Sequence, residues 1–253
     1  MVANPLKSPI APFLFWMGVW QLWASAVGEE LLLPSPIAVF MALCELLPTP
    51  LFWQSMSASL ARVGLGLFWG ILVGLLLGIA TWSNPYAKIY LTPIIQMVQA
   101  TPVVSFILLL LLWTKRDFVP VYVSAFMVAP IIWANTAKGL EQSDTSLLTF
   151  AKAYGYSKWK SFRLISIPAV YPYVLSALES AISLGWKSAV AAEVIALPPF
   201  AIGTKISHAK LYLETTHLFA WTAVMILLSA IMGKVILWIV GLLGGGWSGW
   251  RSL

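Results

Sequence analysis

The sequence has few charged residues and a large excess of apolar ones. Only 9% of the 253 residues are charged, whereas 60% are hydrophobic, and the mean hydropathy is +0.87. A soluble domain of this length cannot bury so much apolar surface, so the lipid bilayer must be its solvent. The 14 tryptophans agree with this interpretation, because indole rings favour the membrane interface.

Cysteine and histidine are too scarce for a metal or redox centre. Cys44 is the only cysteine, which excludes an intrachain disulfide and a cysteine metal cluster. His208 and His217 lie nine residues apart, with no carboxylate pair at ligand spacing. We therefore expect no metal site and no catalytic residue, and a membrane enzyme is the least favoured of the possible functions.

Two further classes of protein are disfavoured by the sequence. The phosphate-binding motif G-x-x-x-x-G-K-[ST] of ATPases does not occur. The formal net charge of +6 could suggest a nucleic acid partner, but excess Lys and Arg in a membrane protein more often set its topology. We expect no nucleic acid partner.

Apolar segments predict an all-α membrane protein with six transmembrane helices. The predicted spans are residues 9–27, 63–82, 89–113, 118–137, 171–196 and 218–243. The first could instead be a signal peptide, because Lys7 precedes it and Ala24, Ser25 and Ala26 resemble a cleavage site. We favour a retained helix.

Four glycines recur at every fourth position of the second predicted span. They are Gly66, Gly70, Gly74 and Gly78, and this spacing places them on one face of a helix. Such a face lets another helix approach closely. The partner could be a helix of the same subunit or a second subunit.

The third predicted span is interrupted by proline and contains polar side chains. Pro93 and Pro102 interrupt it, with Gln96, Gln99 and Thr101 between them. Broken helices with polar groups at membrane depth occur where the backbone is buried in protein or lines a cavity. A translocation path and simple interhelical hydrogen bonding both fit this pattern.

Three ionisable residues lie in the fifth predicted span, namely Glu179, Lys187 and Glu193. Glu179 and Lys187 are roughly 80° apart around a helix and two turns apart along it, so they cannot pair easily. Lys187 could attract an anionic substrate or be neutralised by an acidic residue. For Glu193, near the outer end, we favour a structural or gating hydrogen bond.

The distribution of Lys and Arg predicts the orientation. With six spans and both termini in the cytoplasm, nine basic residues lie inside, five lie outside, and Lys187 stays in the membrane. Residues 147–168 are then cytoplasmic.

This cytoplasmic segment carries Lys152, Lys158, Lys160 and Arg163 and no acidic residue. We expect a helix from Thr145 to Ala153, a left-handed turn at Gly155, and a second helix that begins at Ser157 and that Pro168 stops. The pair could push on a partner as a rigid body, or it could be a solvated linker.

The spacing of Ala151, Gly155, Ile165, Ile167 and Pro168 resembles the cytoplasmic signature of ABC importer permeases. In that family this loop is the coupling helix that docks on the ATPase subunit. The resemblance implies an ATPase-docking surface made of Ala151, Lys152, Ala153, Tyr154, Gly155, Tyr156, Ser157 and Pro168. The chain departs from the signature at Thr149, Phe150 and Ile167, where the family has Glu, Ala and Leu.

Four more stretches resemble the permease subfamily for nitrate, sulfonate, taurine and bicarbonate, which also includes permeases for thiamine precursors. They are LPSPIAVFMAL, SLARV from Ser59, TPIIQMVQATPVVSF, and AAEVI after Trp186. The resemblance implies one transmembrane permease domain over residues 1–253, with the MetI-like type I importer fold, in a bacterial inner membrane.

The same resemblance implies partners and a mechanism. Two permease copies, two ATPases that bind ATP and Mg²⁺, and an extracytoplasmic solute-binding protein would assemble in the bilayer, and this chain would hold no cofactor. Alternating access would move a small anion or a thiamine-precursor-like heterocycle. The expected pathway residues are Gln96, Gln99, Thr101, Ser183 and Lys187.

An ion-coupled secondary transporter or channel is the alternative function. It would use Glu179 and Lys187 as an ion relay and would need no ATPase. It leaves the spacing from Gly155 to Pro168 unexplained.

Overall fold

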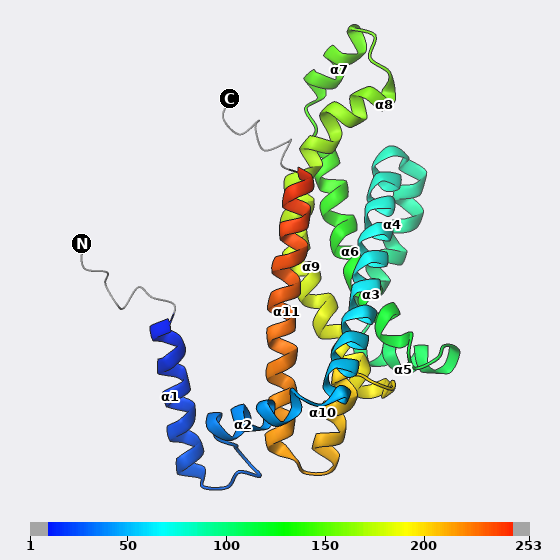
Figure 1. The fold of residues 1–253 in the computed structure, drawn as a ribbon. Helices are drawn as coiled ribbons and strands as arrows, with labels where there is room; N and C mark the ends of the chain where they lie inside the picture. Colours follow the sequence, from blue (N-terminus) through cyan, green and yellow to red (C-terminus); the bar gives the residue numbers. More distant parts are fainter. Residues whose placement is uncertain (1–9, 245–253) are drawn as a thin grey trace, which may run out of the picture.

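The computed structural model describes residues 10–244, and the described residues form helices and no strand. Four long helices lie side by side: α3 (Pro50–Ser83), α6 (Val119–Glu141), α9 (Ile167–Ala196) and α11 (Thr215–Gly244) (Figure 1). Helices α3, α6 and α11 run in one direction, and α9 runs in the opposite direction.

Shorter helices gather at the two ends of this bundle (Figure 1). At one end α7 (Thr145–Ala153) and α8 (Lys158–Ser161) project beyond the long helices, and we refer to it as the α7–α8 end. At the other lie α2 (Pro36–Leu46), α5 (Val103–Trp113) and α10 (Ile202–Leu211), and we refer to it as the α10 end.

Four helices in the described residues are long and apolar enough to cross a membrane, namely α3, α6, the continuous stretch Lys158–Ala196, and α11. A fifth is added if α4 (Pro85–Ala100) and α5, bent by 103°, count as one span. This bend lies in the predicted third span, where the sequence indicates a broken helix. Helix α1 (Ile10–Val27) matches the predicted first span apart from residue 9, which lies outside the described residues.

Two helices are longer than the sequence predicts. The second predicted span begins at residue 63, but α3 begins at Pro50, because the Thr49 hydroxyl caps it and the helix continues through Arg62. The expectation that Pro168 stops a helix is wrong. The π-helical turn Phe162–Ser166, in which the Ile167 N–H donates to the Phe162 carbonyl, leads directly into α9, and the helix continues through Pro168.

The glycine face of α3 packs against α6 of the same chain. A Cβ atom added to Gly66 would lie 2.5 Å from the Cβ of Ser124, and one added to Gly70 would lie 2.7 Å from the Cβ of Val128. A Cβ atom added to Gly74 would likewise lie 2.7 Å from the Cβ of Ile132, and one added to Gly78 would lie 2.5 Å from the Cβ of Thr136. The glycines therefore serve packing inside the subunit, and the alternative of a seam between subunits is wrong.

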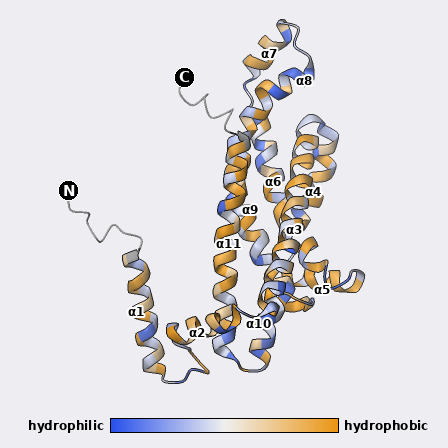
Figure 2. Cartoon of the chain, viewed as in Figure 1, coloured by the Kyte–Doolittle hydropathy of each residue, from blue (hydrophilic) through white to orange (hydrophobic). Residues whose placement is uncertain are grey.

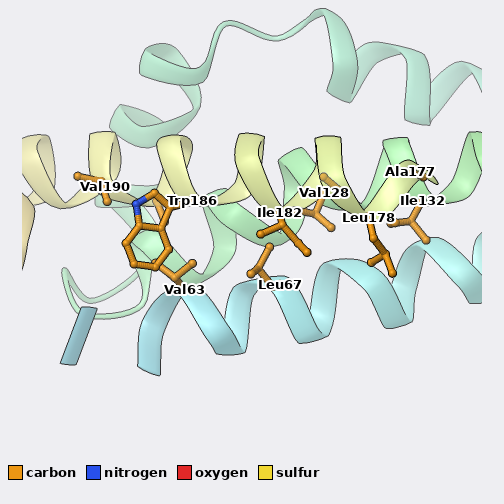
Figure 3. Close-up of a cluster of buried hydrophobic side chains, with 11 residues drawn as sticks. Val63, Leu67, Val128, Ile132, Ala177, Leu178, Ile182, Trp186 and Val190 are labelled. Carbon is orange, nitrogen blue, oxygen red and sulfur yellow. The ribbon is translucent and has the colours of Figure 1, made fainter. Parts of the chain in front are cut away.

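The main apolar core lies where α3, α6 and α9 meet (Figure 3). Trp186 of α9 is fully buried there beside Val63 and Leu67 of α3. Gly185 brings α9 close enough that an added Cβ would lie 2.7 Å from side-chain atoms of Leu67 and Val128. These contacts fix the rotation of α9 about its own axis.

The outward faces of α3 and α11 remain apolar (Figure 2). The exposed side chains there include Leu65, Phe68, Trp69, Ile226, Leu227, Ile231 and Trp238. This exterior suits the hydrocarbon core of a bilayer.

The basic residues fall into two groups, one at each end of the bundle. Lys88, Lys138 and the four basic residues of the segment 147–168 belong to the α7–α8 end, and Arg62, Lys115, Arg116, Lys205 and Lys210 belong to the α10 end. Lys7 and Arg251, which the predicted orientation also places in the cytoplasm, lie outside the described residues.

Candidate functional site

The loop between α6 and α9 is built from two capped helices and a glycine turn. The Asp144 carboxylate accepts a hydrogen bond from the Ser146 N–H at 2.7 Å and starts α7. Gly155 turns the chain with a φ of +72°, and the Ser157 hydroxyl accepts from the Lys160 N–H at 3.2 Å to start α8. Helix α7, the left-handed turn and the start of α8 lie where the sequence predicts them, whereas α8 continues into α9 instead of stopping at Pro168.

One face of α7 presents aromatic groups to solvent. Phe150 is 60% exposed and Tyr154 is 68% exposed, and their ring centroids are 4.4 Å apart. Among the expected docking residues, Ala151 is buried, those from Lys152 to Ser157 are exposed, and Pro168 is half-buried in α9. Exposed aromatic groups on a projecting helix are typical of a protein-binding surface.

A second feature is a stripe of exposed polar residues along α9. Ser176, Glu179, Ser180 and Lys187 are exposed and Ser183 is partly so, although all five lie inside a helix long enough to span a membrane. Their spacing places them within roughly 100° of one another around the helix. We call these five residues the α9 stripe.

Glu179 and Lys187 do not pair with each other. In the described part of the chain, neither forms an ion pair within 4.0 Å of another residue. Because a charge in hydrocarbon is costly, these groups need water, a ligand or a second subunit beside them.

The other expected pathway residues lie on a different part of the bundle. Gln96 and Gln99 are exposed on α4, which packs mainly on α3 and α6, so the structure does not bring them together with the α9 stripe. At the α4–α5 bend, the Thr101 hydroxyl donates to the Met97 carbonyl at 2.8 Å.

Glu193 lies at the α10 end of α9 and is fully buried. The Ser59 hydroxyl of α3 lies 2.8 Å from each carboxylate oxygen, and the Gly203 N–H donates to Oε2 at 3.1 Å. Ser59 in turn accepts from the Ile202 N–H at 2.9 Å. The carboxylate therefore joins α3, α9 and the start of α10.

Arg62 extends this cluster to the loop after α9. Its guanidinium lies 3.5 Å from Glu193 and 2.8 Å from Asp117, and it donates to the carbonyls of Pro199 and Phe200. We call Ser59, Arg62, Asp117 and Glu193 the Glu193 cluster. The pairing of Arg62 with Glu193, and of Asp117 with Arg62, was not predicted from the sequence. An arginine within an apolar helix was the available signal.

Burial also affects a lysine on the adjacent helix. Lys205 of α10 is half-buried, and the resulting desolvation lowers the pKa of its ammonium group. In the described residues, no group of three or more His, Cys, Asp or Glu side chains could hold a metal ion.

Residues 70–248 match the model of the binding-protein-dependent transport system inner membrane component family. The chain belongs to this family. It is the permease component of an ABC importer, its role is transport rather than catalysis, and family membership implies ATPase partners and a solute-binding protein.

Similar proteins agree with this membership. The chain is 26% identical to the taurine transport system permease protein of Escherichia coli (strain K12), over 84% of this chain and 79% of that protein. It is 30% identical to the nitrate import permease protein of Leptolyngbya laminosa, over 77% of this chain and 72% of the relative.

The crystal structure of an amino acid ABC transporter matches the fold. The TM-score is 0.60 at 18% identity, over 79% of this chain and 96% of the other. This likeness shows the fold alone. Members of the family transport with a binding protein, which argues against an ion-coupled carrier.

Proposed function

We propose that two copies of this chain form the membrane pathway of an importer for a small anion. The α9 stripe supports the pairing, because polar groups at membrane depth require a second wall that excludes lipid. Lys187 supports an anionic substrate, as do the taurine and nitrate relatives. A thiamine-precursor-like heterocycle is the other substrate class that the sequence resemblance leaves open.

In this proposal the chain crosses a bacterial inner membrane six times. Helix α1 is the first span and the bent pair α4–α5 is the third, in addition to the four long helices. The α7–α8 end and both termini face the cytoplasm, as the excess of basic residues at that end favours. The α10 end faces the solute-binding protein.

The α7–α8 loop is the proposed coupling element. Its exposed residues from Lys152 to Ser157, with Phe150 beside them, would dock on an ATPase that binds ATP and Mg²⁺. Closure of the ATPase pair would move α9 through the continuous helical connection from Lys158. The pathway would then open to alternate sides of the membrane, with Gln96, Gln99, Thr101, Ser183 and Lys187 along it.

The observation that carries the proposal is the capped helix pair that projects beyond the bundle with exposed aromatic groups (Figure 1). The first test is co-purification. The chain, solubilised from its native membrane in mild detergent, is expected to recover an ATPase subunit. Recovery of no ATPase, together with ATP-independent transport in liposomes, would contradict the proposal.

A second test perturbs the loop itself. Gly155→Val places a β-branched residue at a φ of +72°, which costs about 1–2 kcal/mol and displaces α8. We expect ATP-driven uptake in liposomes to fall by about tenfold or more. Gly28→Val is the matched control, because Gly28 has a φ of +70° at the far end of α1. Equal uptake by both variants would remove the loop from the coupling mechanism.

A further inference from the structure

A hollow lies between the α7–α8 loop and the end of α3. Its volume is about 570 Å³, and Trp82 of α3 lies on one side of it. Lys152, Lys158 and Trp159 of the loop lie on the other side. This size is within the range of roughly 300–1,000 Å³ that small-ligand sites occupy.

The hollow shares Lys152 and Tyr156 with the proposed ATPase surface but lies on the other side of α7 from Phe150. A separate surface on α7 is lined by Thr145, Thr149 and Phe150, whereas Leu148 and Lys152 of the same helix border the hollow. The two faces are roughly 100° apart around α7. A ligand in the hollow would therefore sit between the loop and the bundle.

The charge around the hollow is positive. Lys152 and Lys158 line it, Lys160 lies 4.0 Å from the ring centroid of Tyr156, and no acidic residue occurs from Thr145 to Leu178. The acidic group at the start of this segment, Asp144, caps α7. Such a surface attracts an anion.

The hollow also contains a buried polar group without a partner. Ser166 is 1% exposed and lines the hollow, and its hydroxyl has no hydrogen-bond partner among the described residues. It ends the π-helical turn Phe162–Ser166. π-Helical turns are frequent at functional sites, and a buried hydroxyl gains free energy from an acceptor.

Aromatic rings place this hollow at the depth of the membrane interface. Trp82 lies one residue before the end of the spanning helix α3, and its ring centroid is 6.3 Å from that of Phe162. Trp159 stacks on Phe162 at 5.9 Å and is 70% exposed. Tryptophan favours the level of the lipid headgroups.

We propose that this hollow binds a phosphate ester monoanion, as carried by an anionic phospholipid headgroup. The lysine ammonium groups neutralise the phosphate, the Ser166 hydroxyl donates to one of its oxygens, and the indole rings contact the glycerol. A bound headgroup would tie the coupling loop to the membrane surface. A soluble phosphate ester shares this chemistry, so the source must be tested.

Binding is measured on the purified full-length chain in detergent by native mass spectrometry. One arm adds phosphatidylglycerol, with phosphatidylcholine as the neutral comparison, and the other adds glycerophosphoglycerol, the deacylated phosphodiester headgroup, without lipid. We expect the double variant Lys152→Met with Lys158→Met to bind phosphatidylglycerol about tenfold more weakly. The control variant Lys115→Met with Lys210→Met removes the same charge at the α10 end and should bind as the wild type does.

A variant without charge change separates a site from general attraction. Ser166→Ala should weaken binding about threefold, whereas Ser55→Ala, which removes another buried hydroxyl without a partner, should have no effect. Weaker binding by the lysine and serine variants than by the wild type would support the site. The ligand whose binding is weakened, the lipid or the soluble ester, identifies the source of the phosphate. Equal binding by the wild type and the lysine variant in both arms would overturn the proposal. The measurement requires no ATPase, so it is independent of the transport test.

Discussion

Lys187 is a lysine inside a membrane-spanning helix, exposed and without an ion-pair partner in the described part of the chain. An uncompensated ammonium group at this depth is maintained only where it meets water or an anion. From the sequence alone an acid of the same subunit could neutralise Lys187, but the described residues contain no such pair.

Replacing this lysine should separate transport from assembly. We expect Lys187→Met to lower anion uptake by about tenfold or more, because a hydrogen bond to a charged group contributes about 1.5–3 kcal/mol. Co-purification with the ATPase should be unchanged. Lys234→Met, an exposed lysine in the span α11, is the control, and equal uptake by both variants would make Lys187 a structural residue.

The Glu193 cluster shows what a buried carboxylate needs. Glu193 is satisfied by a serine hydroxyl, a backbone N–H and a guanidinium at 3.5 Å, and Arg62 holds two carbonyls of the loop that follows. Leu197 and Phe200 in that loop adopt positive φ values of 51° and 49°. The cluster therefore fixes a loop conformation that its own residues disfavour.

Glu193→Ala leaves Arg62, Ser59 and the Gly203 N–H without a common acceptor. Removing one partner of a buried ion pair costs about 3–5 kcal/mol, so the melting temperature in detergent should fall by several degrees or more. Glu214→Ala changes an exposed carboxylate at the same end and should have little effect. A wild-type melting temperature for Glu193→Ala would show that water replaces the carboxylate.

At the level of helices, the α3–α6 interface is governed by backbone proximity. The four glycines of α3 let the backbones approach until Ser124, Val128, Ile132 and Thr136 occupy the space of a side chain. Small residues provide such packing in membranes, where the hydrophobic effect does not drive helices together.

A single methyl group tests this interface. Gly70→Ala would place its Cβ 2.7 Å from the Val128 Cβ, and such overpacking costs about 1–3 kcal/mol. Gly64→Ala, on the same helix with nothing within 4 Å, should be neutral or slightly stabilising, because alanine favours a helix more than glycine does. Equal melting temperatures for the two variants would mean that α3 and α6 move apart to accommodate the methyl group without losing stability.

For the whole molecule, the α9 stripe and the apolar exterior together predict a pair of subunits. The α11 surface around Leu227 suits lipid, whereas the surface around Ser183 does not. A second copy that faces the stripe would turn two incomplete walls into one aqueous path.

Cross-linking tests this arrangement in the membrane. Cys44 is the single native cysteine, so a Cys44→Ser background allows one cysteine to be placed at will. We expect Ser183→Cys to give disulfide-linked dimers on mild oxidation and Leu227→Cys to give none. Dimers from the second position alone would place the interface on α11.

The local pattern of the sequence sufficed for several parts of the structure. Hydropathy predicts helices close to those observed for α1, α6, α9 and α11, because a span must be apolar along its length. Gly155 and Ser157 predict the turn and cap of the α7–α8 loop, because φ and capping depend on adjacent residues. The spacing of that loop also indicated the family to which the chain belongs.

Tertiary structure alone decided which distant residues meet. Glu193 finds Ser59 across 134 positions, and no local property of either residue specifies that contact. The glycine face could have met any helix, and the packing of α6 against it resolved the choice. The continuity of Lys158 with α9 depended on a π-helical turn that accommodates Pro168. Periodicity defines the faces of each helix, but the mutual packing of all helices determines what each face contacts.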